Sequence, residues 1–277
     1  MAVISSFAYG SSDFLGGLAA KHAPVLRVVA IAALAGLAGV LCALPLIGAH
    51  FSAQAVAWGM ANGLASVAAS VLLYRCLALG PMNVLSPLAA VISAVLPLLV
   101  ALAQGERLEG LAAMGIALAF VAVVLISARP RQPARRPLPV ALLCAVGAGG
   151  AVATQAITLD HAPPDSALAP VVVSVALNAM LTVTAEFVAR IRSGPRPGMR
   201  TAAAMSGLVA ALAHVAFLLA VRQGPLSVVA VISALYPAVT VVLARTVLHE
   251  RIARVHQAGF AVAVAAVSLL AWSRLGQ

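Results

Sequence analysis

Charged residues are scarce in this sequence. They make up 9% of the 277 residues, whereas a soluble domain carries about 25%, so a surface that faces water on all sides is excluded. Hydrophobic residues account for 63%, and the mean hydropathy is +1.09. Apolar runs of about 20 residues, long enough to cross a hydrocarbon core of about 30 Å, recur along the chain, and they lack the alternation of a transmembrane β-barrel. The sequence therefore predicts an all-α membrane protein.

Cysteine is also scarce, and the basic residues form no compact block. Cys42, Cys76 and Cys144 stand alone inside apolar runs, without the paired spacing of a metal site or a disulfide framework, and we expect small core residues. The net charge of +10 comes mostly from Arg between apolar runs, with no interleaved aromatics. We interpret it as charge that orients the chain in the lipid bilayer, and we expect no nucleic-acid partner.

The motifs of nucleotide-driven pumps and of intramembrane enzymes are missing as well. The sequence has no GxxxxGK[ST] loop, no HExxH or GxSxG motif and no pair of intramembrane carboxylates. We therefore expect no cofactor, no metal and no catalytic residue, and we do not predict an enzyme. Transport by such a chain would draw on an ion gradient or on the gradient of the substrate itself.

The chain does contain an internal repeat. Residues 63–125 and 207–269 align at a constant offset of 144 positions without a gap. This repeat predicts a first five-helix repeat at 1–127, a basic Pro/Arg linker at 128–139 and a second five-helix repeat at 140–277. Each copy contains a Gly-Pro step, a long apolar run and then a Glu-Arg step, namely Gly80-Pro81 and Glu106-Arg107, then Gly224-Pro225 and Glu250-Arg251.

Ten transmembrane helices are expected, five in each half. Residues 2–20 lack a basic n-region and a cleavage site, so they are predicted to form a first helix rather than a removable signal peptide. Because five is odd, the second half enters the membrane from the opposite side, which predicts inverted repeats, as in transporters with a midplane substrate site. The helices are expected at 2–20, 25–48, 54–79, 82–104, 109–128, 140–158, 166–189, 202–222, 226–247 and 255–273.

The basic residues also predict an orientation. Most of them lie in or beside the connections that follow the odd-numbered helices, including the central linker. The positive-inside rule then places the linker in the cytoplasm and both termini outside.

The ten helices, the half-length repeat, the YGSSDF stretch at 9–14 and the Gly-Pro to Glu-Arg blocks resemble the EamA-type ten-helix branch of the drug/metabolite transporter superfamily. The resemblance covers nearly the whole chain. It implies a basket-like fold with a central cavity and transport of small organic metabolites, often as efflux, in a plasma membrane of the bacterial inner-membrane type. It also implies cytoplasmic termini, in conflict with the charge distribution, so the orientation stays open.

Three candidate site residues, Tyr9, Ser12 and Asp13, lie together in the first helix. A carboxylate in mid-membrane costs about 3 kcal/mol or more unless it faces a cavity or is neutralised. A carboxyl group away from water takes up a proton more readily, so Asp13 could couple substrate movement to a proton gradient. The alternative is a structural Asp13, at a wet helix end or bonded to a neighbouring serine.

Further candidates are polar residues inside otherwise apolar spans. His214, which aligns with Ser70 of the first repeat, could titrate or bind a substrate. Tyr236 precedes Pro237, which loosens a helix. These candidates could line one polar cavity, or each could form a hydrogen bond between helices. The remaining candidates are Asn62, Ser66, Tyr74, Gln155 and Asn178.

The repeated steps are assigned to the framework. Glu106-Arg107 and Glu250-Arg251 are expected to open the fifth and tenth helices, because a Glu near a helix N-terminus is favoured by the helix dipole. Glu186 is expected to reach toward the membrane interface.

The predicted function is a secondary transporter of a small organic metabolite or drug, an exporter that works by alternating access, with proton coupling as an option. The alternative is a flippase or scramblase of a lipid-linked precursor on the same scaffold. The expected partners are the small-molecule substrate and the lipid bilayer, and a homo-oligomer is left open.

Overall fold

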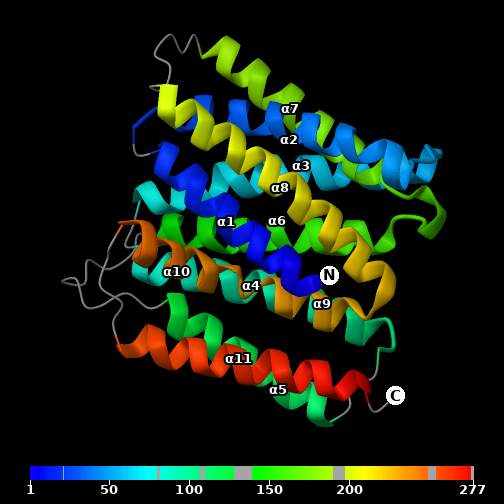
Figure 1. Cartoon of the computed structure of the whole chain (residues 1–277), viewed down its shortest axis with the longest axis vertical. Helices are drawn as coiled ribbons and strands as arrows, with labels where there is room; N and C mark the ends of the chain where they lie inside the picture. Colours follow the sequence, from blue (N-terminus) through cyan, green and yellow to red (C-terminus); the bar gives the residue numbers. More distant parts are fainter. Residues whose placement is uncertain are drawn as a thin grey trace. The chain divides into compact units, whose positions relative to one another are not determined.

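The computed structural model describes residues 1–20, 22–79, 82–106, 110–127, 139–189, 197–248 and 254–275. Within these ranges the chain is helical apart from short turns, and no β-strand occurs beyond the isolated bridge between Ala49 and Ala167. The predicted all-α class is confirmed. The helices (Figure 1) are α1 (Ala2–Ala20), α2 (Val25–Ile47), α3 (Ala53–Leu79), α4 (Met82–Ala103), α5 (Gly110–Ser127), α6 (Pro139–His161), the 3₁₀ turn η1 (Pro164–Ser166), α7 (Ala169–Val188), α8 (Pro197–Gln223), α9 (Leu226–Ser233), α10 (Tyr236–Leu248) and α11 (Arg254–Leu275).

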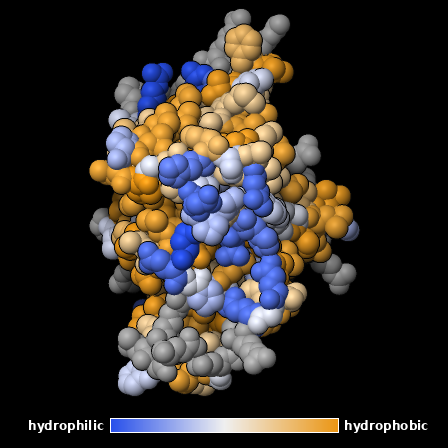
Figure 2. All heavy atoms as spheres, turned by 90° about the vertical axis from the view of Figure 1, so that its right-hand side faces the viewer, coloured by the Kyte–Doolittle hydropathy of each residue, from blue (hydrophilic) through white to orange (hydrophobic). Residues whose placement is uncertain are grey.

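Five of the described helices are long and apolar enough to cross a membrane: α2, α6, α7, and the segments Ala53–Leu72 of α3 and Gly198–Gln223 of α8. Four further apolar segments are shorter, at Leu88–Ala103, Gly110–Ile126, Leu226–Thr240 and Gln257–Trp272. Figure 2 shows apolar side chains over much of one face, around a hydrophilic patch. The chain is therefore a multi-pass membrane protein, while the count of ten spans stays a prediction.

The predicted helix 226–247 is interrupted, which corrects the expectation of one continuous span. Pro237 has no N–H to donate to the carbonyl of Ser233, so the regular ladder fails there. The backbone instead forms shorter-range bonds, from Leu235 N to Ile232 O at 3.2 Å and from Ala238 N to Leu235 O at 2.9 Å. Two helices, α9 and α10, result.

Gly105, which precedes the first Glu-Arg step, lies in a helix C-terminal cap at the end of α4. Gly105 has a φ of +91°, which suits glycine, and its N–H bonds to Leu102 O while Glu106 N bonds to Ala101 O, each at 3.0 Å. The Glu106 carboxylate accepts a hydrogen bond from Ser227 Oγ at the start of α9. Glu106 thus joins the end of α4 to the second Gly-Pro block, a contact that its expected helix-opening role did not include. Arg107 and Glu250-Arg251 lie outside the described residues.

The chain divides into two compact units, each built from both sequence halves. The first holds Met1, Val3–Val67 and Thr158–Arg222, and the second holds Ala2, Ala68–Ile157 and Gln223–Gln277. The unit boundaries therefore fall inside α3 and α6 rather than at the predicted linker. That linker lies outside the described residues except for Pro139, where α6 begins.

In the first unit, two glycines that are equivalent in the repeat allow close helix contact. A Cβ on Gly63 of α3 would lie 2.9 Å from the carbonyl oxygen of Ser174 in α7. A Cβ on Gly207 of α8 would overlap with the carbonyl oxygen of Ala32 in α2. Small residues at such positions let transmembrane helices approach through their backbones.

In the second unit, α5 and α11 lie side by side (Figure 1) and show the same equivalence in pairs. A Cβ on Gly115 would lie 2.8 Å from Leu270 Cγ, and one on Gly259 would lie 2.8 Å from Ile126 Cγ1. Gly115 with Gly259, and Ile126 with Leu270, are each 144 positions apart. Each helix thus places its glycine against an apolar side chain of the other helix, as expected for two helices related by a local two-fold axis.

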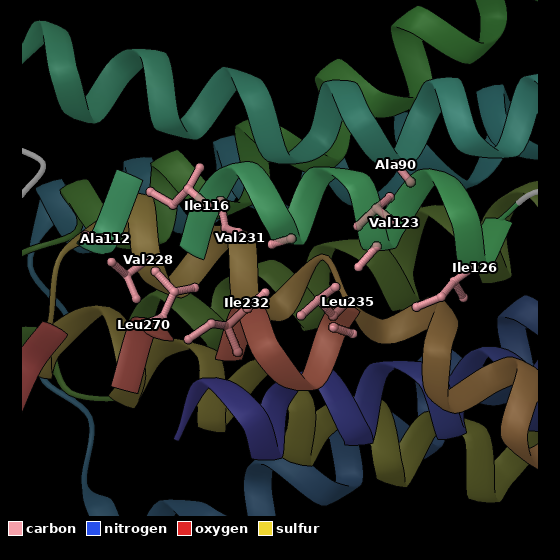
Figure 3. Packing of buried hydrophobic residues seen from close by; sticks show 14 residues of the cluster. Ala90, Ala112, Ile116, Val123, Ile126, Val228, Val231, Ile232, Leu235 and Leu270 are labelled. Atoms are coloured by element: carbon pink, nitrogen blue, oxygen red, sulfur yellow. The ribbon is translucent and has the colours of Figure 1, made fainter. Parts of the chain in front are cut away.

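The apolar core of this unit surrounds that pair of helices. Figure 3 shows Ile116, Val123 and Ile126 of α5 among side chains from α9 and α11. This apolar packing holds α5, α9 and α11 together in the second unit.

Candidate functional site

Asp13 lies at the border of the exposed apolar face of α1, about 80° around the helix from Val3, which is 55% exposed. Ile4 and Phe7 are 48% and 60% exposed, and at about 100° per residue Asp13 is about 180° from Ile4 and about 120° from Phe7. The Asp13 side chain is nevertheless exposed, whereas its neighbours Ser12 and Phe14 are buried. The carboxylate is therefore accessible beside the contact of α1 with its neighbour, opposite Ile4 on the helix.

A reciprocal pair of hydrogen bonds fixes α1 against α8 next to Asp13. Ser12 Oγ donates to the carbonyl oxygen of Ser206 at 2.9 Å, and Ser206 Oγ donates to the carbonyl oxygen of Ser12 at 2.8 Å. Gly16 permits this approach, because a Cβ there would lie 3.0 Å from Ser206 Oγ. Ser12, one of the three predicted residues in α1, thus has a structural role. Its contact with α8 positions the other two, Tyr9 and Asp13.

The same two helices bring Tyr9 and His214 together. Their ring centroids are 5.4 Å apart with an interplanar angle of 72°, an edge-to-face contact. His214 Nδ1 lies 2.7 Å from the carbonyl oxygen of Ala210. Because a carbonyl only accepts, Nδ1 carries the hydrogen, and the neutral ring then presents Nε2 as an acceptor.

Asp13 lies one helical turn after Tyr9, and residues four apart on a helix share a face. The structure therefore gathers three of the predicted candidates, Tyr9, Asp13 and His214, in one region of the first unit. No Lys, Arg or His in the described part of the chain forms an ion pair with Asp13. A carboxylate, a phenol and an imidazole acceptor, with no cation paired to the carboxylate in the described residues, are groups that can exchange a proton or contact a positively charged group.

Three other candidates, Asn62, Ser66 and Asn178, form hydrogen bonds between helices. Asn62 is fully buried; its Nδ2 donates to Thr158 Oγ1 at 2.9 Å, and its Oδ1 accepts from Ser174 Oγ at 2.6 Å. Asn178 Nδ2 donates to Ser66 Oγ at 2.8 Å. These bonds match the structural alternative for the amides, since they join α3 to α6 and α7 in the first unit.

The roles of the remaining candidates stay predictions. Gln155 and Tyr236 belong to the second unit, and both are half-buried. The side chain of Tyr74 lies outside the described residues. Glu186, expected at the membrane interface, forms an ion pair with Arg27 that links α7 to α2.

Three polar partners were missed by sequence reasoning, Thr158, Ser174 and Ser206. The repeat could have found one of them, because Ser206-Gly207 stands 144 positions after Asn62-Gly63. The hydrogen bonds of Ser206 with α1 and of Asn62 with α6 therefore involve equivalent positions of α8 and α3. Their partners Ser12 and Thr158 are 146 positions apart, two more than the repeat offset, and the residue after Thr158 is the apolar Leu159, whereas Asp13 follows Ser12.

Comparisons with known proteins support the family resemblance and the fold. The family described as "EamA-like transporter family" matches residues 136–272, which confirms the predicted resemblance over the second half of the chain. A solved structure described as "Crystal structure of protein" has a TM-score of 0.77 at 14% sequence identity, covering 100% of this chain and 98% of that chain. At that identity the likeness concerns the fold alone. No curated protein matches the sequence.

Proposed function

We propose that this chain, whose residues 136–272 match the EamA-like transporter family, is a secondary transporter that exports a small organic metabolite or drug across the plasma membrane. In this proposal the protein works by alternating access, and Asp13 of α1 couples substrate movement to protons. Tyr9 and His214 border the same site, and the bond between Ser12 and Ser206 holds α1 in register with α8.

The observation that carries proton coupling is the accessible carboxylate of Asp13, which forms no ion pair with any residue that the structure describes. An ionisable side chain within a membrane helix is costly and is usually functional. A proton taken up by Asp13 removes its charge, so the site differs electrostatically between its two protonation states. A transporter needs such a difference for a proton gradient to bias one direction of movement.

The equivalent contacts of the two halves support alternating access. Gly63 and Gly207, Asn62 and Ser206, and the α5–α11 pairs occupy matching positions in the repeat. In inverted-repeat transporters, the two halves can exchange conformations around a fixed site.

The test is flux into proteoliposomes that hold the purified full chain under an imposed pH gradient. We expect a panel of radiolabelled small metabolites to include one that the gradient drives, and Asp13→Asn to lower this driven flux at least about tenfold. Asp165→Asn is the matched control, because Asp165 is an exposed carboxylate in η1 of the same unit; its flux should equal that of the wild type.

Three outcomes would contradict parts of the proposal. Flux that ignores both the gradient and Asp13→Asn would exclude coupling through Asp13. Translocation of a fluorescent lipid probe without any metabolite flux would favour the flippase. Flux that runs only toward the cytoplasmic side in vesicles of known orientation would exclude export.

A further inference from the structure

Among the described residues, no Lys, Arg or His forms an ion pair with the Asp13 carboxylate. The helix that carries it, α1, contains no Lys or Arg. In α8, the helix that contacts α1 here, the basic side chains other than His214 are Arg200 and Arg222 near its two ends. A carboxylate in this setting is stabilised by a proton or by a bound cation.

The groups beside Asp13 fit a ligand with both N–H donors and an apolar part. Tyr9, one turn away on the same helix, offers a half-buried ring, and an aromatic ring attracts a cation within about 6 Å of its centre. His214 donates from Nδ1 to Ala210, which leaves Nε2 as an acceptor rather than a donor. The carboxylate and Nε2 both accept hydrogen bonds, so an anionic or acceptor-only ligand would be poorly matched.

We propose that Tyr9, Asp13 and His214 form a binding site for a monovalent organic cation, a protonated primary amine that carries an apolar or aromatic group. The ammonium group donates hydrogen bonds to the Asp13 carboxylate and to His214 Nε2, and the apolar group lies against the ring of Tyr9. The inference rests on the proposed transport function only in that it names the substrate class of the same site.

Equilibrium binding to the purified full chain in detergent tests the site apart from transport. The probes are three tritiated compounds of similar size: 2-phenylethylamine, protonated at neutral pH, 2-phenylethanol, neutral, and phenylacetate, anionic. We expect the amine to bind at least about tenfold more tightly than the other two, because a charge-assisted hydrogen bond strengthens binding by about that factor or more. Protein-free micelles give the background.

Four variants test the roles of Asp13 and Tyr9. Asp13→Asn should lose the preference for the amine, Asp13→Glu should keep most of it, and Tyr9→Leu should weaken the amine about fivefold through loss of the ring. Asp165→Asn, an exposed acid remote in sequence from α1 and α8, should bind as the wild type does. Asp13→Glu and Tyr9→Leu keep the test decisive if Asp13→Asn fails to fold.

Equal binding of the three probes, including no binding of any, overturns the inference, and so does an amine preference that persists in Asp13→Asn. The two proposals can fail separately. Amine binding that depends on Asp13 without flux in proteoliposomes supports the site and contradicts the transporter. Gradient-driven flux of a neutral or anionic metabolite together with no amine preference contradicts the site and leaves the transporter standing.

Discussion

Asn62 is the polar residue whose surroundings most restrict substitution. It is fully buried and uses both ends of its amide, as a donor to Thr158 and as an acceptor from Ser174. Its repeat equivalent Ser206 makes a smaller contact, with the single residue Ser12. Asn62 therefore joins three helices, α3, α6 and α7. Ser206, at the equivalent position of the repeat, joins two, α8 and α1.

We predict that Asn62→Ala lowers the free energy of unfolding by about 1–3 kcal/mol, because it leaves two buried hydroxyl groups without their amide partner. Ser206→Ala should cost about 0.6 kcal/mol, a typical value for a hydrogen bond between membrane helices. Unfolding of the purified protein in detergent and SDS measures both. Thr201→Ala is the control, because that exposed hydroxyl bonds within its own helix, to the carbonyl oxygen of Gly198; an equal cost in all three variants would contradict the prediction.

At the scale of the helices, glycines fix which pairs can touch. The backbones of α8 and α2 meet at Gly207, where no side chain fits beside the carbonyl of Ala32. Gly17 of α1 is the opposite case, exposed and with no atom within 4 Å of the position that a Cβ would take. Both are helical glycines, so a change to alanine has the same intrinsic effect on the helix at each position.

We predict that Gly207→Ala destabilises the protein by about 1–3 kcal/mol or more, because the added methyl group forces α8 away from α2. Gly17→Ala should leave the stability unchanged or slightly raised, since alanine favours the helix by up to about 1 kcal/mol over glycine. Thermal unfolding of the membrane-extracted protein measures both variants. Similar melting temperatures for the two would show that the close approach at Gly207 does not limit the packing.

The helices were predictable because their ends depend on local chemistry. Pro and Gly mark most of the breaks, and α1 runs over the expected residues 2–20. The break before Tyr236 was missed because a membrane helix can retain a proline, and only the backbone shows that the ladder fails there. At the site, the unusual types Asp13 and His214 were visible in the sequence. Their meeting through Ser206 was not, because a serine in an apolar helix gives little signal by itself.

At the scale of the whole molecule, the positions of the basic residues and the family resemblance predict opposite orientations of the chain in the membrane. The basic residues predict a cytoplasmic linker and outside termini, whereas the resemblance implies cytoplasmic termini. If there are ten spans, the α6–α7 connection, which contains η1, lies on the side opposite to the linker in either case. Asp165 in this connection is exposed, so a label there reports the orientation of the chain directly.

We predict, from the positive-inside rule, that Asp165→Cys is labelled from outside intact cells by a membrane-impermeant maleimide. The background chain has Cys42, Cys76 and Cys144 replaced by Ala, so that the new thiol is the single target. The rule applies because the Arg-rich linker is held in the cytoplasm during insertion, which forces the next connection outward. Labelling only after the cells are permeabilised would reverse the orientation in favour of the family pattern. A third result, labelling of both this position and a Cys placed in the linker from outside, would contradict α6 as a membrane span and with it the prediction of five spans in the second half.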